Sequence, residues 1–391
     1  MSRSEQYWLH VPLETTPGML LEAPPDRCLT VRGRRAQLFE REPYISFVTA
    51  NALVIKQWLL FDPLPEGDAR NLLGDLRARL PVVAMNMGAN FRIPGGAPDV
   101  ASTAAYDGAV PTLIPVHLSP APAWNDPAGS CSWSAQDVLE RTLEDSPPVN
   151  DDRVLAALEL FITSQYDFLQ RSQFLAQLTI LDALATRAKR SGAAAEWIDR
   201  KLVEAEAEGF GDPGLLSALG GLKDESHGAA IRTLVRRAVV SLGGSEAEAR
   251  RQARAVGKLY KARSRLSHKG SVVELDLGHA TQLARLVLNA SARNPSILEV
   301  GTGEDASLQS GLQQRQRWIA EADAAIRRVH PDCAAVVDAI RRPLILNQLG
   351  PLTARLTDGS EWLIGPETAR QLSEREIPDW PAFHESFPET D

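Results

Sequence analysis

The stretch Ser245–Gly270, SEAEARRQARAVGKLYKARSRLSHKG, decides how the rest of the chain is interpreted. It predicts one helix with both ends marked, because Ser245 and Glu248 form a capping-box pattern and Gly270 suits the left-handed residue that closes many helices. The stretch carries eight basic residues and only two acidic ones, whereas the whole chain has a formal net charge of −8. Such a local inversion of charge indicates either a surface that binds an anion or a solvated helix face.

The basic side chains of this helix recur three and four residues apart, so most of them share one face. The residues that we expect to bind nucleic acid are Arg251, Arg254, Lys258, Lys261, Arg265 and Lys269. A second face is apolar, and Arg263 lies in line with it, seven residues after Val256. An arginine in an apolar stripe either extends its guanidinium to the surface or is held by a partner.

Composition limits the classes of function. The length of 391 residues predicts two or three domains, and the contents of 44% hydrophobic and 24% charged residues are ordinary for a soluble protein. The net charge of −8 argues against a general nucleic-acid coat, so a polyanion site must be a local patch. The three cysteines are far apart and form no CxxC pair, which indicates neither a disulfide framework nor a zinc site.

The sequence also predicts a cytoplasmic protein with no membrane partner. Its start lacks the apolar core of a signal peptide, and no segment reaches the ~18 apolar residues that a membrane helix needs.

Changes in composition along the chain predict an α+β protein in three parts. Residues 1–148 combine short apolar runs with proline and glycine, which favours a mixed α/β domain with an amphipathic helix at 67–80. Proline and acidic residues at 146–152 predict a domain boundary. Helical periodicity then dominates 153–341 and predicts an all-α bundle, and 342–391 form a tail.

Three further elements are predicted near the C-terminus. Cys333–Leu346 has a helical pattern, Asp358-Gly359 lies between two β-prone runs as in a hairpin, and 367–376 is expected to form a short helix.

The residues best suited to chemistry are Arg263 and His268, near the end of the basic helix. Cleavage of RNA without a metal needs a group that takes the 2′-hydroxyl proton, a group that protonates the 5′-oxygen and a cation for the phosphate. Histidine suits proton transfer near neutrality, and the planar guanidinium of arginine suits phosphate. Five residues along a straight helix leave the two side chains about 140° apart. Either the helix ends before His268, or two protomers pair to form a composite cleft.

The segment Tyr260-Lys-Ala-Arg263-Ser264-Arg-Leu-Ser-His268-Lys-Gly270 resembles the signature of the HEPN superfamily (higher eukaryote and prokaryote nucleotide-binding domains), in particular its ApeA-like group. The resemblance covers about 171–292. FLAQLTILDALATRA at 174–188 is similar to the first core helix of the family, with Asp182 at the acidic position, although the acid there is more usually Glu. SHGAAIRTLV and LDLGHATQLARLVLNA are similar to the middle and closing helices.

The resemblance implies a helical bundle that forms a homodimer, with Arg263 and His268 in a cleft between protomers. Active relatives are metal-independent endoribonucleases of toxin–antitoxin and anti-phage defence systems. His268 would be the acid/base, Arg263 would bind the scissile phosphate and Ser264 would position a group or a water. Asp182 and Tyr260 would support the site. The resemblance also implies that RNA is the substrate and that the reaction uses neither a metal nor a cofactor.

Two alternatives stay open. Relatives that keep the fold without catalysis bind nucleotides or nucleic acid, or serve as dimerisation modules. Separately, Ile297–Asp305, ILEVGTGED, resembles the strand and glycine turn of S-adenosylmethionine-dependent methyltransferases, although a turn between helices is the simpler interpretation.

The remaining histidines and tryptophans are expected to have structural roles. His10 and His117 are isolated, and His227 and His279 lie on helical segments, where either could line the cleft but a packed or surface position is more usual. Trp197 and Trp318 are expected to anchor the packing of helices.

Overall fold

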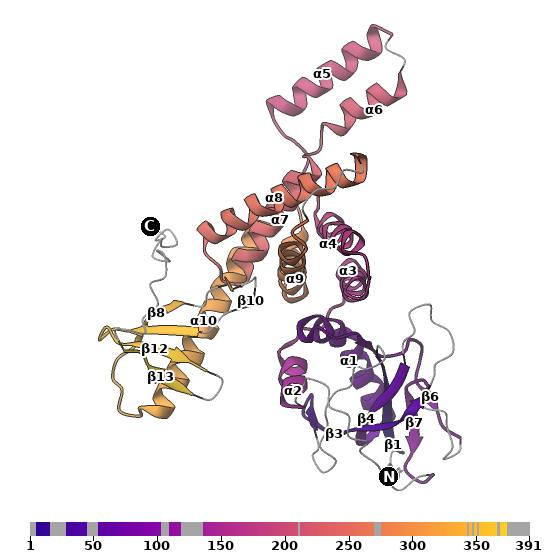
Figure 1. Ribbon diagram of the computed structural model, residues 1–391, viewed down its shortest axis with the longest axis vertical. Coiled ribbons are helices and arrows are strands. Elements are labelled where there is room, and N and C mark those ends of the chain that lie inside the picture. Colours follow the sequence, from indigo (N-terminus) through magenta and orange to yellow (C-terminus); the bar gives the residue numbers. More distant parts are fainter. Residues whose placement is uncertain are drawn as a thin grey trace. The chain divides into compact units, whose positions relative to one another are not determined.

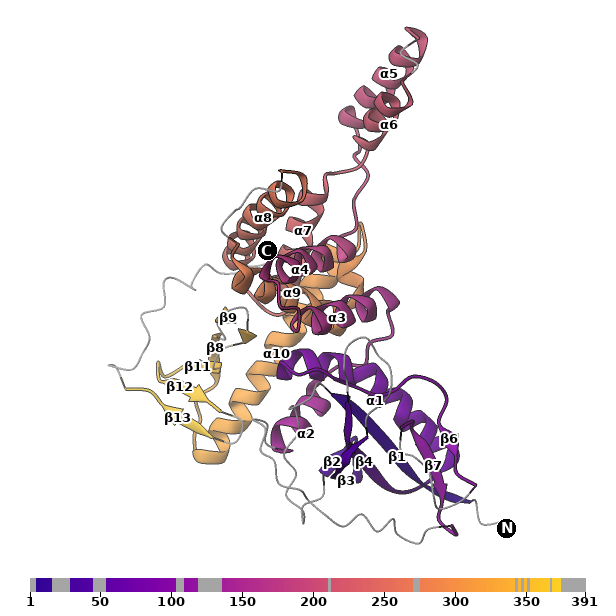
Figure 2. The same ribbon diagram turned by 45° about the vertical axis from the view of Figure 1, so that its right-hand side comes forward.

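The computed structural model describes residues 5–15, 29–44, 54–102, 109–118, 136–209, 212–269, 275–341, 344–345, 348–349, 352–365 and 368–373. The chain is an α+β protein and divides into two compact units, Met1–Tyr166 and Asp167–Asp391. Figures 1 and 2 show the elements of each unit.

The first unit is built on a mostly antiparallel sheet in the order β2-β3-β4-β1-β7-β6, with β5 also pairing with β1. The strands are β1 (Gln6–Thr15), β2 (Leu29–Val31), β3 (Arg34–Tyr44), β4 (Val54–Pro65), β5 (Phe91–Arg92), β6 (Asp99–Val100) and β7 (Thr112–Pro115). Leu9 and Phe61 are opposite each other in β1 and β4 and are fully buried. Arg32 and Gly33, with φ of 52° and 68°, make the two-residue turn between β2 and β3, as a type I′ hairpin requires.

Helix α1 (Glu66–Met87) packs on this sheet and supplies much of the first core. The helix predicted at 67–80 is therefore confirmed, and it continues through Pro81 to Met87. Val82 and Val83, in the part that follows the proline, are fully buried. Burial of this kind offsets the backbone hydrogen bond that a proline inside a helix removes.

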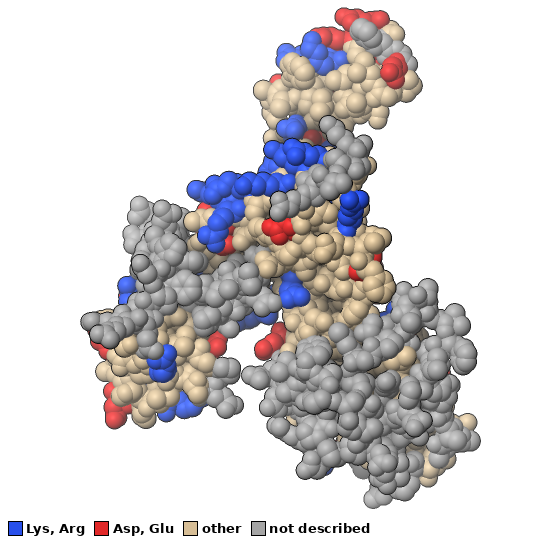
Figure 3. Space-filling model, viewed as in Figure 1, with Lys and Arg blue, Asp and Glu red and all other residues tan. Residues whose placement is uncertain are grey.

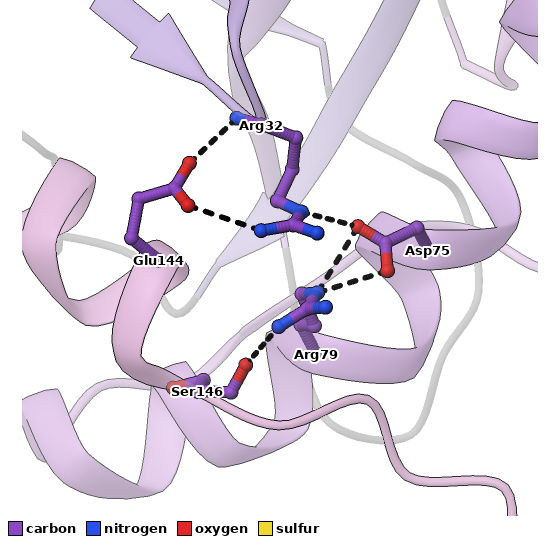
Figure 4. Close-up of polar contacts among 5 residues, drawn as sticks. All are labelled: Arg32, Asp75, Arg79, Glu144 and Ser146. Carbon is purple, nitrogen blue, oxygen red and sulfur yellow. Dashed lines mark hydrogen bonds and ion pairs between the residues drawn. The ribbon is translucent and has the colours of Figure 1, made fainter. Parts of the chain in front are cut away.

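A network of charges ties the β2–β3 turn to α1 and α2 (Gln136–Asp145), as Figure 4 shows. The Arg32 guanidinium donates to Asp75 at 2.9 Å and to Glu144 at 3.0 Å. Arg79, whose side chain is 10% exposed, donates to the same Asp75 carboxylate at 2.9 Å and to the backbone carbonyl of Ser146. Buried charges are tolerated only when they are paired in this way.

Helix α3 (Asp152–Ser164) belongs to the first unit, because it packs on α1 and contributes Ile162 to the same core. Its start is capped by Asp151, whose carboxylate accepts from the amides of Arg153 and Val154. The units accordingly divide after α3, at Tyr166, and not at the proline-containing break of 146–152.

The second unit is centred on helices that the sequence predicts. They are α4 (Gln170–Leu184), α7 (His227–Ser241), α8 (Glu246–Lys269), α9 (Leu277–Arg293) and α10 (Gly303–Val329). α4 packs on α9, and α7 packs on α8, α9 and α10. Most of each segment that resembles a HEPN core helix lies in α4, α7 or α9, although 174–188 extends past the end of α4 at Leu184.

A helical hairpin, α5 (Ala193–Ala207) and α6 (Pro213–Gly221), is inserted between α4 and α7. A bridge between Lys189 and Asp224 closes its base, with an ion pair of 2.7 Å between the two side chains. The expectation that Trp197 anchors packing is wrong, since its side chain on α5 is 48% exposed. No residue of α6 is buried, so this hairpin adds little to the core.

Close approach of α7 and α10 depends on glycine. A Cβ added at Gly311 of α10 would lie 2.4 Å from the Val240 carbonyl oxygen of α7. Gly243, in the α7–α8 turn with φ of 83°, lies against Trp318, which is buried as predicted. Any larger side chain at Gly311 must push the two helices apart.

The segment Ile297–Asp305 forms no strand. Pro295–Leu298 is a short 3-10 helix, η1, and α10 begins at Gly303. The glycines therefore lie in a turn between helices, and the strand that the methyltransferase motif requires is missing from this described segment.

A small antiparallel sheet in the order β13-β12-β11-β8 packs on the second half of α10. Its strands are β8 (Val337–Arg341), β11 (Leu352–Leu356), β12 (Glu361–Ile364) and β13 (Ala369–Gln371), and a separate pair is β9 (Leu344–Ile345) with β10 (Gln348–Leu349). The hairpin at Asp358-Gly359 is confirmed by the pairing of β11 with β12.

Two predicted helices near the C-terminus are wrong. Cys333–Leu346 contains β8 and β9, and the described part of 367–376 contains β13. Strand pairing overrides the helical pattern in both places, because β8 pairs with β11 and β13 pairs with β12.

Candidate functional site

Helix α8 carries most of the predicted site residues, and its start is fixed by a local signal. The Ser245 hydroxyl accepts from the Glu248 amide at 3.2 Å, which confirms the predicted cap. The Glu248 carboxylate, instead of closing the capping box, accepts from the Gln252 side chain at 2.7 Å and pairs with Arg251. Val256 and Leu259 are buried and hold the apolar face of α8 against the bundle.

The basic face of α8 is largely unneutralised. Figure 3 shows lysine and arginine side chains gathered over this helix. Arg251 pairs with Glu248, but no ion pair joins Arg254, Lys258, Lys261 or Arg265 to a carboxylate among the residues that the structure describes. The side chain of Lys269 and all of Gly270 lie outside the described residues. Four cations on one helix face thus keep a positive charge that a polyanion could neutralise.

A groove of about 800 Å³ runs between α8 and the start of α9. It is lined by Arg251, Arg254, Ala255, Lys258, Leu259, Ala262, Leu275, Asp276 and His279. His279 is held at its rim, because its Nε2 lies 3.1 Å from the Gln252 amide oxygen and its backbone amide donates to Asp276. The groove therefore brings three of the six predicted nucleic-acid-binding residues together with a histidine.

Arg263 projects from another side of α8 and is held by a partner, which is one of the two outcomes expected for it. Its guanidinium lies 3.7 Å from the Asp182 carboxylate of α4 and 5.5 Å from the centre of the Tyr260 ring. Burial raises the pKa of Tyr260, the charge of Asp182 raises it further, and the Arg263 cation opposes both effects. The structure thus brings Arg263, Asp182 and Tyr260 together.

His227, for which a packed or surface position is the more usual expectation, also contacts Asp182. It starts α7, where the Ser226 hydroxyl accepts from the Ala229 amide and caps the helix. The His227 Nδ1 lies 2.9 Å from the second oxygen of the Asp182 carboxylate. The side chains of His227, Arg263 and Asp182 are 52%, 27% and 22% exposed, so the group is open to solvent. We call Asp182, His227, Tyr260 and Arg263 the Asp182 cluster.

Helix α8 extends past His268. α8 runs unbroken to Lys269, so the interpretation in which the helix ends before His268 is wrong. Positions 263 and 268 consequently fall about 140° apart around the helix axis. Ser264 is half-buried beside Arg263, whereas the His268 side chain lies outside the described residues.

Two other histidines belong to the first unit. His10 is fully buried and stacks on Trp58 with 6.2 Å between ring centres, in keeping with a structural role. His117 is exposed and lies 3.3 Å from the Glu5 carboxylate.

Two further features concern the residues that the structure describes. No group of three or more histidine, cysteine, aspartate or glutamate side chains there could hold a metal ion. No helix among them is both long and apolar enough to span a bilayer.

No family model, curated protein or solved structure matches the chain.

Proposed function

We propose that the protein is a metal-independent endoribonuclease of HEPN type that acts as a homodimer. The observation that carries this proposal is the Asp182 cluster, in which one carboxylate contacts both an imidazole, at 2.9 Å, and a guanidinium, at 3.7 Å. An imidazole transfers protons near neutral pH, and a guanidinium binds the phosphate whose charge grows in the transition state.

The unpaired cations of α8 support RNA as the substrate. Arg254, Lys258, Lys261 and Arg265 would neutralise the phosphates of a bound strand. Arg263 would bind the scissile phosphate, Ser264 would position it, and His268 of a second protomer would exchange protons with it. A second protomer is needed because positions 263 and 268 lie on different sides of one helix.

The reaction needs only the RNA and these side chains. The 2′-oxygen attacks the neighbouring phosphorus while its proton passes to a base. The bond from phosphorus to the 5′-oxygen then breaks, and an acid protonates the leaving oxygen. The products are a 2′,3′-cyclic phosphate and a 5′-hydroxyl end.

Cleavage of single-stranded RNA in the presence of EDTA tests the proposal. We expect the wild type to cleave, and Arg263→Ala and His268→Ala each to lose at least about 100-fold in rate. Arg250→Ala is a matched control, since Arg250 lies on the same helix but pairs with Glu246 at 3.2 Å. Cleavage that neither site variant affects would rule out this site.

One observation favours a second candidate, a binding module without catalysis. Arg263 is already paired with Asp182 and stacked on Tyr260, while the groove of Arg254 and Lys258 is a separate cationic surface. RNA binding that weakens with salt, without cleavage of any RNA tested, would favour this alternative.

A further inference from the structure

We propose that His227 is the general base of the reaction and that Asp182 is its positioning residue. This inference rests on the proposed RNA cleavage and adds to it a proton acceptor within the same protomer as Arg263.

The contact with Asp182 determines which nitrogen of His227 is free to act. A carboxylate has no proton to give at neutral pH, so Nδ1 of His227 must donate to it across the 2.9 Å contact. The lone pair of the neutral imidazole then resides on Nε2. Because the side chain is 52% exposed, a substrate hydroxyl can reach the ring. A histidine oriented by a carboxylate in this way is the usual arrangement for removing a proton from a hydroxyl.

The same carboxylate sets the distance between the base and the phosphate-binding group. One oxygen of Asp182 contacts His227, and the other lies 3.7 Å from Arg263. The second contact is longer than a hydrogen bond, so Arg263 can turn one edge of its guanidinium to a phosphate without separating from the carboxylate. A base and a guanidinium held by one carboxylate can act only on groups that lie close together in the substrate. In RNA the 2′-hydroxyl and the scissile phosphate are such neighbours.

The chemical step is the removal of the 2′-hydroxyl proton. Nε2 of His227 accepts this proton as the bond between the 2′-oxygen and phosphorus forms and the bond to the 5′-oxygen breaks. The departing 5′-oxygen takes its proton from a different acid, the role that remains for His268. His227 returns its proton to solvent after the product leaves.

The charged and titratable groups around His227 come from three helices. Asp182 faces it from α4, Tyr260 and Arg263 come from α8, and Arg232 of α7 lies beside Gly228. The pH dependence of the reaction must therefore be assigned by substitution, with the wild-type profile as the reference.

The rate of RNA cleavage in EDTA, measured against pH for the wild type and His227→Gln, tests the inference. A general base works only when unprotonated, so the wild-type rate should rise with pH along an acid limb. We expect His227→Gln to lose at least about 100-fold in rate and to lose that limb. We expect Asp182→Asn to lower the cleavage rate by a smaller factor than His227→Gln does. We also expect added imidazole to restore part of the cleavage activity of His227→Ala.

His117→Gln is a matched control, because His117 is also an exposed histidine beside a carboxylate, 3.3 Å from Glu5, and has no place in the Asp182 cluster. We expect its cleavage rate and pH profile to match those of the wild type.

The outcomes separate this inference from the proposed function. If the wild type cleaves and His227→Gln keeps either the rate or the acid limb, the role of His227 is overturned and the proposed function stands. A wild type that does not cleave RNA overturns both. Thermal melting of each variant separates loss of folding from loss of chemistry, and imidazole rescue cannot come from a purely structural defect.

Discussion

Asp182 and His227 are 45 residues apart in sequence, yet the His227 Nδ1 lies 2.9 Å from the Asp182 carboxylate. The second oxygen of that carboxylate lies 3.7 Å from Arg263. An acid of α4 thus connects the first residue of α7 to the later part of α8.

The first prediction concerns the basic face of α8. Replacing both Arg254 and Lys258 by alanine should weaken RNA binding and lower the slope of log affinity against log salt by about one to two, since each phosphate contact contributes close to one. Binding titrations over a range of salt concentrations measure the slope.

The control for this prediction removes the same amount of charge elsewhere. Arg250 and Lys201 are cations that pair with Glu246 and Glu204. Their double alanine variant should keep the wild-type slope. Equal salt slopes for the two double variants would mean that Arg254 and Lys258 contribute no more to RNA binding than the two paired cations do.

The second prediction concerns the composite site. If Arg263 comes from one protomer and His268 from the other, an equal mixture of Arg263→Ala and His268→Ala subunits forms some dimers with one intact site. After exchange of subunits, the mixture should regain about a quarter of the wild-type cleavage rate. A mixture as inactive as its two components would show that both residues act within one protomer.

The third prediction concerns the stability of the first unit. Asp75→Ala should lower the free energy of unfolding by about 2 to 4 kcal/mol, because it leaves the nearly buried Arg79 without its carboxylate. Asp68→Ala removes an exposed pair with Arg34 and should cost less than about 1 kcal/mol. Denaturant unfolding of both variants gives the comparison, and equal losses would refute the role assigned to Asp75.

The fourth prediction concerns the packing of α7 on α10. Gly311→Ala should destabilise the second unit by about 1 to 3 kcal/mol, since the added methyl group would meet the Val240 carbonyl. Gly74→Ala in α1 is the matched control, because nothing lies within 4 Å of its added Cβ. That control should be neutral or stabilising, since alanine favours helix more than glycine does. Thermal melting distinguishes the two, and a Gly311→Ala variant as stable as the wild type would contradict the account of this contact.

The features that the sequence predicts correctly depend on residues close together in the chain. The cap at Ser245, the helix after it and the turn at Asp358-Gly359 depend on residues a few positions apart, and the structure has all three. The division of α8 into a basic and an apolar face follows from its periodicity. The resemblance places Asp182 in the same site as Arg263, and the two side chains lie 3.7 Å apart.

The features that the sequence does not predict depend on contacts between residues far apart in the chain. Cys333–Leu346 has the alanines and the spacing of a helix, but β8 pairs with β11, which follows it in the chain. His227 carries no local sign of its carboxylate partner, because the hairpin of α5 and α6 lies between Asp182 and α7 in sequence. Only the packing of α4 beside α7 and α8 brings the two together.

The chemistry of the ends produced from RNA in EDTA tests the central claim most directly. A substrate with a single ribonucleotide in an otherwise 2′-deoxy strand should be cut by the wild type after that ribonucleotide, leaving a 2′,3′-cyclic phosphate and a 5′-hydroxyl, and Arg263→Ala should abolish the cut. Mass spectrometry of the fragments identifies both ends. Cleavage of the fully 2′-deoxy strand, a 5′-phosphate on the downstream fragment, or no cleavage of any RNA without added metal would contradict the account.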